Sequence, residues 1–183
     1  MKYALAYMAP GAAAWAALGL LLWQMHIPVL IWLLVGAVYA AVYGLGRLWP
    51  AGIAPPTIRW QVPAQWVIDR RWASTLIWGF VLGPGVLTRN PLAGMWMLPV
   101  SLALQTDVQS AVGLGAALGA LHGAARATAV MRLQPRLASQ RRPELELFAS
   151  LWRWRMIDGF VLLFALGALC SGLFAFWWVR HPV

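Results

Sequence analysis

Long apolar stretches, separated by two arginine-rich segments, dominate the pattern of hydrophobic and polar positions along the chain. A membrane-spanning helix needs about 20 predominantly apolar residues, because the hydrocarbon core of a bilayer is about 30 Å thick. Four stretches have this length, and we predict spanning helices over residues 3–25, 28–46, 110–131 and 156–179. The pattern therefore predicts an all-α, polytopic integral membrane protein that forms a single membrane domain over residues 1–183.

A fifth apolar stretch, residues 73–105, is too long for one straight span. As a single helix rising 1.5 Å per residue it would extend about 50 Å. A Gly-Pro-Gly sequence at 83–85 interrupts it, and a Thr-Arg-Asn-Pro sequence at 88–91 interrupts it again. Proline removes a backbone donor and clashes with the preceding helical turn. We therefore predict a broken segment that is either re-entrant or a kinked span.

Arginine placement predicts the orientation of these spans. The connections at 47–72 and 132–155 are rich in arginine, whereas the link at 24–28 carries no formal charge. Cytoplasmic loops of membrane proteins carry the excess of Lys and Arg. Both connections are therefore predicted to be cytoplasmic, which requires segment 73–105 to cross once. The prediction is five crossings of a cell membrane, the bacterial inner membrane, with a cytoplasmic N-terminus.

Within the second connection, Pro143 followed by Glu144 is typical of a helix start. Leu145, Phe148 and Trp152 then recur at helical spacing. We predict an amphipathic helix here that continues into the last span.

Composition agrees with a membrane protein and disfavours a soluble enzyme. Hydrophobic residues make up 62% of the chain and charged residues 10%, against about 25% charged in soluble domains. The net charge of +9 is explained by cytoplasmic loops beside anionic lipid head groups, so we expect the bilayer and not nucleic acid as the partner. The single cysteine, Cys170, excludes an internal disulfide. The sequence has no phosphate-binding loop, HExxH or GxSxG motif, so we predict no catalytic residue and no enzyme.

The broken segment is the strongest indication of a function. Backbone groups freed inside a bilayer must be satisfied by protein, water or a ligand, and transporters use such breaks to present them to substrates. The candidate substrate-path residues are polar or helix-breaking positions inside predicted spans: Gly83, Pro84, Gly85, Thr88, Arg89, Asn90 and His122. The alternative is an interfacial turn, with Arg89 reaching outer-leaflet phosphates.

Span 110–131 carries small residues at every fourth position, which share one helix face: Ala111, Gly115, Gly119, Gly123 and Ala127. Such a face permits close approach of another helix. Packing against a neighbouring span, a homodimer face and a slot for a flat cofactor all fit this pattern.

His122 lies beside that face, deep in the predicted span. An ionisable group at such depth is a functional candidate, for proton relay or for ligating haem or chlorophyll. No second deep histidine accompanies it. We therefore predict a packed, hydrogen-bonded histidine, no cofactor and no metal.

Two ion pairs are expected at the span boundaries. Arg126 and Asp158 are predicted to pair on the cytoplasmic side, and Arg89 and Asp107 on the outer side. Such pairs mainly fix helix register.

Residues 78–88 contain an aromatic residue, a glycine, apolar residues, Leu-Gly-x-Gly, two further apolar residues and a threonine. This pattern resembles one in the cytochrome c biogenesis and DsbD-like transmembrane family. The Gly- and Ala-rich span ending at Arg126 is similar to the span that follows it there, so the resemblance covers residues 72–131.

The resemblance implies a polytopic domain with broken helices, which often passes reducing equivalents across the membrane. Redox members of that family need paired cysteines beside a proline, whereas this chain has Gly83 and Gly85 around Pro84. The resemblance therefore implies the broken-helix scaffold, and neither a thiol relay nor a catalytic residue.

Two function classes remain open. One is a transporter or permease-like protein built around the break. The other is a non-catalytic structural or assembly subunit of a larger membrane complex, and either could form a homo-oligomer.

Overall fold

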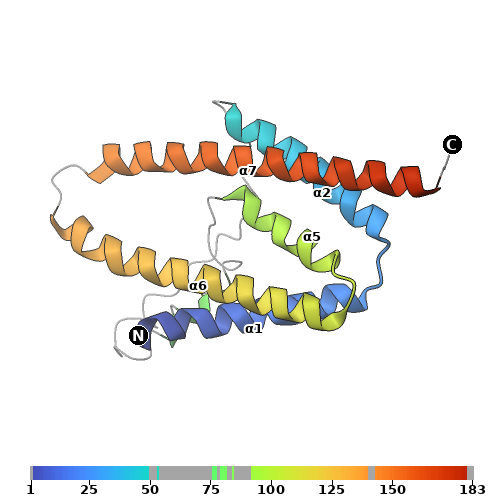
Figure 1. Cartoon of the computed structure of the whole chain (residues 1–183). Helices are drawn as coiled ribbons and strands as arrows, with labels where there is room; N and C mark the ends of the chain where they lie inside the picture. Colours follow the sequence, from blue (N-terminus) through green and yellow to red (C-terminus); the bar gives the residue numbers. More distant parts are fainter. Residues whose placement is uncertain are drawn as a thin grey trace. The chain divides into compact units, whose positions relative to one another are not determined.

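The computed structural model describes residues 2–49, 53, 76–77, 79–81, 84, 92–139 and 143–180 (Figure 1). Every regular element in these ranges is a helix, which confirms the predicted all-α class. In chain order the elements are α1 (Lys2–Gln24), α2 (Val29–Leu48), the 3-10 helix η1 (Ala93–Met97), α5 (Leu98–Ala103), α6 (Val108–Ser139) and α7 (Pro143–Arg180).

Among the described residues, three helices are long and apolar enough to cross a membrane. They are Ala4–Gln24 within α1, Val29–Leu48, and Trp152–Arg180 within α7. These correspond to the predicted spans 3–25, 28–46 and 156–179. These three helices are compatible with a membrane protein, and the five crossings stay a prediction.

The predicted span 110–131 forms a helix, α6, but α6 is not among the helices that are apolar enough to span. Its composition explains the difference. Glycine and alanine expose little apolar surface to lipid, and His122 and Arg126 lie within the same stretch. The glycines that allow another helix to pack closely against α6 therefore also lower the mean hydropathy of α6.

The predicted second connection, 132–155, is largely helical. α6 continues to Ser139, and α7 begins at Pro143 as predicted and runs without interruption to Arg180. The first predicted connection, 47–72, lies outside the described residues apart from the end of α2, Trp49 and Ile53.

The chain packs as two compact units. Unit 1 comprises Met1–Leu21, Thr57–Asn90 and Thr106–Pro143, and unit 2 comprises Leu22–Pro56, Pro91–Gln105 and Glu144–Val183.

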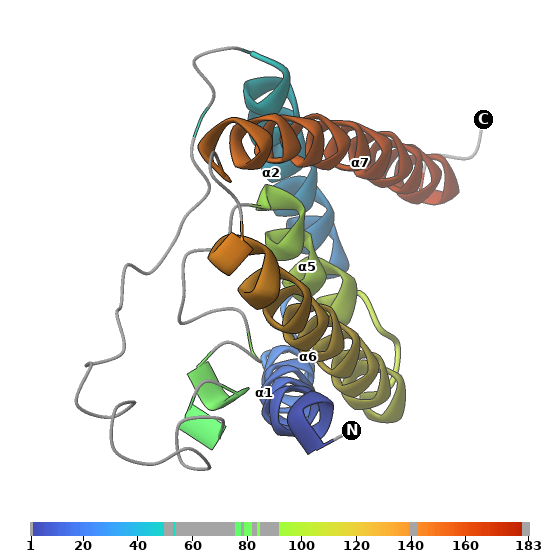
Figure 2. The same ribbon diagram turned by 90° about the vertical axis from the view of Figure 1, so that its left-hand side faces the viewer.

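In unit 1, α1 and α6 lie side by side (Figure 2). Their contact follows the small-residue face predicted for α6. A Cβ added at Gly115 would collide with the carbonyl of Trp15, and one added at Gly119 would lie 2.9 Å from the backbone nitrogen of Ala12. The two backbones therefore touch, and α1 occupies the face that the sequence left open to a neighbouring span, a second copy or a cofactor.

In unit 2, α2 and α7 pack antiparallel, with η1 and α5 against them. One buried cluster joins Leu33 and Ala37 of α2 to Val100 of α5 and Leu169 of α7. A second joins the buried residues Ala40, Ala93 and Leu162. Apolar packing thus holds the short helix against two long ones.

Candidate functional site

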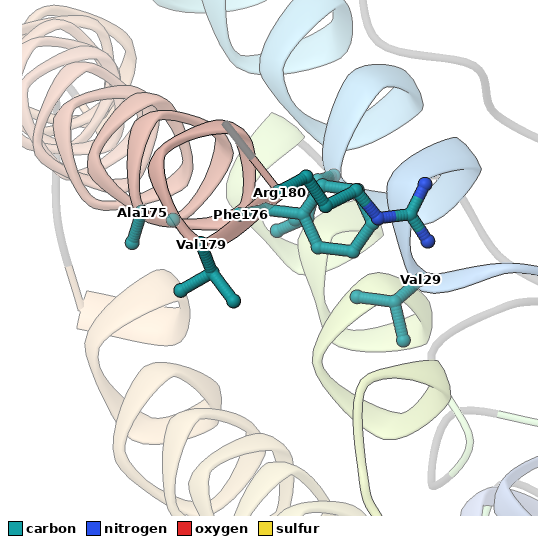
Figure 3. Close-up of a pocket in the computed structure, with 7 residues that line it drawn as sticks. Val29, Ala175, Phe176, Val179 and Arg180 are labelled. Atoms are coloured by element: carbon teal, nitrogen blue, oxygen red, sulfur yellow. The ribbon is translucent and has the colours of Figure 1, made fainter. Parts of the chain in front are cut away.

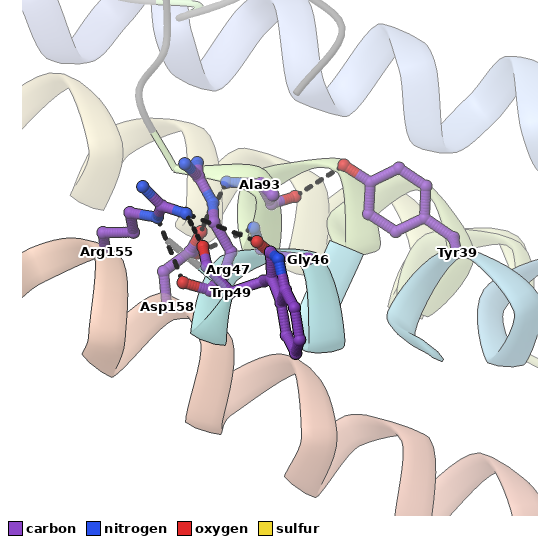
Figure 4. Close-up of polar contacts among 8 residues, drawn as sticks. Tyr39, Gly46, Arg47, Trp49, Ala93, Arg155 and Asp158 are labelled. Carbon is purple, nitrogen blue, oxygen red and sulfur yellow. Dashed lines mark hydrogen bonds and ion pairs between the residues drawn. The ribbon is translucent and has the colours of Figure 1, made fainter. Parts of the chain in front are cut away.

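A buried carboxylate, Asp158, lies where α2, η1 and α7 of unit 2 meet (Figure 4). Its Oδ2 accepts hydrogen bonds from Nε of Arg47 at 3.0 Å and from the backbone N–H of Ala93 at 2.7 Å. Its Oδ1 accepts a hydrogen bond from the backbone N–H of Gly94 at 2.8 Å. Asp158 is 6% exposed and Arg47 7%, so both charges are almost fully removed from solvent.

The start of η1 explains why a carboxylate is held there. The first N–H groups of a helix have no partner within it and favour a negative charge. Gly94 allows the close approach, because a Cβ at this position would lie 2.8 Å from Oδ1 of Asp158. The Tyr39 hydroxyl donates to the carbonyl of Ala93 at 2.9 Å. The first residue of η1 is therefore held through both its N–H and its carbonyl.

Arg155, one turn before Asp158, binds the opposite kind of helix end. Its Nε donates to the carbonyl of Arg47 at 3.0 Å, and its Nη2 donates to Gly46 at 3.4 Å and to Trp49. The last carbonyls of a helix lack partners within it and favour a cation. α7 thus caps the end of α2 with Arg155 and the start of η1 with Asp158.

These contacts around Asp158 form a polar junction between α2, η1 and α7. It comprises the side chains of Arg47, Tyr39 and Arg155 and the backbone N–H groups of Ala93 and Gly94. Burying two charges costs several kcal/mol per ion, and good geometry with additional hydrogen bonds is needed to repay it. Asp158 has that geometry, because its carboxylate accepts three hydrogen bonds. The arrangement can therefore fix the position of the short helix relative to α2 and α7.

Within unit 2 Asp158 pairs with Arg47, a partner that the sequence did not suggest. The reason lies in the antiparallel register of α2 and α7, which brings the last turn of α2 beside Asp158. The predicted pair of Arg126 and Asp158 would join residues of different units, and it stays a prediction. Arg47 had been assigned only to the arginine-rich connection 47–72. Tyr39 and Gly94 were also missed. The available signal in the sequence was Pro91, which marks a helix start just after it.

The predicted break is described only at Pro84. This residue lies in a bend, and its carbonyl accepts a hydrogen bond from Nε1 of Trp15 at 2.9 Å. Trp15 is 2% exposed, so α1 satisfies a backbone group that the bend leaves without a helical partner. The other candidate residues of the break lie outside the described part of the chain: Gly83, Gly85, Thr88, Arg89 and Asn90.

His122 lies on α6 in unit 1. Its Nε2 is buried and has no hydrogen-bond partner within the described residues. The predicted hydrogen bond is therefore not seen there. Within the same residues, no group of three His, Cys, Asp or Glu side chains could hold a metal ion.

Asp107 caps the start of α6. Its carboxylate accepts hydrogen bonds from the backbone N–H of Ser110 at 2.8 Å and from the Ser110 hydroxyl at 2.7 Å. These bonds lower the pKa of Asp107 below its ordinary value, with the backbone bond contributing most. Its predicted partner, Arg89, lies outside the described residues.

No family model, curated protein or solved structure matches this chain. The resemblance to the DsbD-like family therefore stays a prediction.

Proposed function

We propose that the protein is a small multi-pass membrane protein of transporter or permease-like type, built around the broken segment 73–105. The observation that carries the proposal is the short apolar helix Ala93–Ala103, which begins at a buried charged junction. A helix of η1 and α5 together extends less than about 20 Å and cannot cross a bilayer. Short helices of this kind line the central sites of many transporters.

Polar side chains on the short helix and just after its end support this proposal. Ser101 and Gln105 are half-buried, and the Ser101 hydroxyl donates to the carbonyl of Leu98 while Gln105 donates to the carbonyl of Ser101. Both bonds stay within the helix and its end. Because neither side chain is bonded to another helix in the described part of the chain, the Ser101 hydroxyl and the Gln105 amide are available to line a water-filled path beside α5.

Cysteine accessibility tests the proposal without knowledge of the solute. In a Cys170→Ser background, Ser101→Cys is expected to react with a membrane-impermeant thiol reagent at least about tenfold faster than a lipid-facing control, because the reactive thiolate forms only where water reaches. Val38→Cys on α2 is the matched control, since Val38 is 62% exposed on an apolar span. Equal, slow labelling of both cysteines would contradict a water-accessible path.

A second candidate is a non-catalytic subunit of a larger membrane complex. Aromatic residues near the end of α7 favour it: Phe174, Trp177 and Trp178 form a ring cluster and are each more than half exposed. Large exposed aromatic surfaces are typical of interaction sites. Detergent-solubilised protein that migrates as a large assembly of fixed composition would favour this candidate over the transporter.

The proposed orientation in a cell membrane has a cytoplasmic N-terminus and five crossings. Cysteines introduced at Ser139 and at Val183 are then expected to label from opposite sides in a Cys170→Ser background, because the arginine-rich connection remains cytoplasmic. Right-side-out and inverted vesicles separate the two signals. Labelling of both cysteines from one side would remove the five-crossing topology.

A further inference from the structure

An open apolar groove runs along α2 and α7, at the end of unit 2 where α2 begins and α7 finishes (Figure 3). Its lining is aliphatic and aromatic, apart from one cation: Val29, Leu33, Gly172, Ala175, Phe176, Val179 and Arg180. Both helices are long and apolar enough to cross a membrane. The groove therefore starts at the level of their ends, where a bilayer has its head groups, and extends along the apolar spans.

Small residues create the groove. A Cβ at Gly172 would reach no closer than 3.6 Å to Cδ2 of Leu33, which is ordinary van der Waals contact. A larger side chain at Gly172 would extend into this space. The gap between α2 and α7 is thus left by the absence of a side chain at Gly172 and by the single methyl group of Ala175.

Arg180 lies at one end of this groove. Its guanidinium carbon is 4.4 Å from the centre of the Phe176 ring, a cation–π contact. The ring therefore holds the charge beside the groove (Figure 3). A guanidinium in this position presents its planar set of donors, which suits the oxygens of a phosphate.

We propose that the groove binds one anionic phospholipid, with an acyl chain between α2 and α7 and its phosphate on Arg180. Charge complementarity decides the occupant, because an apolar channel with a cation at its head-group end matches an acyl chain attached to a phosphate. Trp177 and Trp178, both about half exposed, flank this end, and tryptophan favours the same interfacial level. The proposal is independent of transport, since a lipid could hold α2 against α7 in either function class.

Native mass spectrometry of the full chain in detergent tests this proposal. The probes are phosphatidylglycerol and phosphatidylcholine with the same acyl chains, and inorganic phosphate. One basic residue near an anionic lipid contributes about 1 kcal/mol, which is about fivefold in affinity. Wild-type protein is therefore expected to bind phosphatidylglycerol about fivefold more tightly than phosphatidylcholine, and not to bind inorganic phosphate.

Two variants separate the head-group contact from the groove. Arg180→Gln is expected to remove the preference for phosphatidylglycerol while both lipids still bind. Gly172→Leu is expected to weaken binding of both lipids. Gly167→Leu is the matched control on the same helix, because no atom lies within 4 Å of a Cβ at Gly167, and it should bind like wild type.

Several results would overturn the proposal. One is an unchanged lipid preference in Arg180→Gln, which alters an exposed side chain and tests the proposal even if Gly172→Leu fails to fold. Another is equal lipid binding by the Gly172 and Gly167 variants. Competition by inorganic phosphate would indicate a simple anion site, and loss of a dimer in Gly172→Leu would indicate that the groove receives a second copy of the chain.

Discussion

Asp158→Asn is expected to lower the free energy of unfolding by about 3–5 kcal/mol, the usual cost of removing one partner of a buried ion pair. Asparagine has nearly the same size, so packing is conserved and the change is one of charge and hydrogen bonding. Arg47, 7% exposed, would keep a buried charge without its carboxylate. The N–H groups of Ala93 and Gly94 would share one amide oxygen where they now have two carboxylate oxygens.

The measurement is the unfolding transition of the purified protein in mixed micelles, followed by circular dichroism. Asp107→Asn is the matched control, because Asp107 makes its hydrogen bonds at an exposed helix start, and asparagine caps helices about as well as aspartate. An unfolding transition of Asp158→Asn that coincides with the control would mean that the junction does not stabilise the fold.

The Arg47→Met, Asp158→Asn double variant gives the coupling between the two side chains. Methionine replaces the guanidinium by an apolar chain of similar length, so position 47 no longer carries a buried cation. The double variant is therefore expected to be less destabilised than the sum of the two single variants. The loss in free energy of unfolding that remains in the double variant would measure how much Asp158 stabilises the start of η1.

The length of the apolar stretches made α1, α2 and the end of α7 predictable. A run of about 20 apolar residues has few stable alternatives to a spanning helix, and the proline at position 143 marked the start of α7. α6 was less predictable as a span. Its glycines lower its hydropathy, and they also permit backbone contact with α1. The sequence of α6 alone does not show that α1 is the helix that makes this contact.

The polar junction was not predictable as a constellation. Asp158 stood out as an acidic residue at the edge of a span, but its partner depends on the antiparallel register of α2 and α7. That register is set by apolar contacts such as those of Leu33, Ala37 and Leu169. Sequence spacing within one helix cannot show this register, so the sequence did not indicate Arg47 as a partner of Asp158.

The small-residue face of α6 was predictable from its spacing of four, and its partner was not. α1 presents Tyr7, Gly11, Trp15 and Gly19 at the same spacing and opposite α6. Because Tyr7 and Trp15 are large, α1 does not show a small-residue pattern. The glycines of α6 contact the backbone atoms of these residues. Every residue type has the same backbone atoms, so the sequence of α1 does not identify it as the partner.

Gly119→Ala is expected to destabilise the α1–α6 pair by about 1–3 kcal/mol, the usual cost of adding a methyl group to a tightly packed contact. The new Cβ would meet the backbone of Gly11 and lie 2.9 Å from the nitrogen of Ala12. Backbone atoms of a helix cannot rotate away as a side chain can, so the helices must separate. In lipid no hydrophobic force opposes this separation, because association depends on close packing.

Gly113→Ala makes the same substitution on the same helix where no atom lies within 4 Å. Alanine has the higher helix propensity, by about 1 kcal/mol, so this variant is expected to be as stable as wild type or more stable. The two substitutions thus have opposite expected signs, and unfolding in mixed micelles measures both. If Gly119→Ala raised stability as Gly113→Ala does, α1 and α6 would not be in backbone contact, and the small-residue face would be open to a different partner.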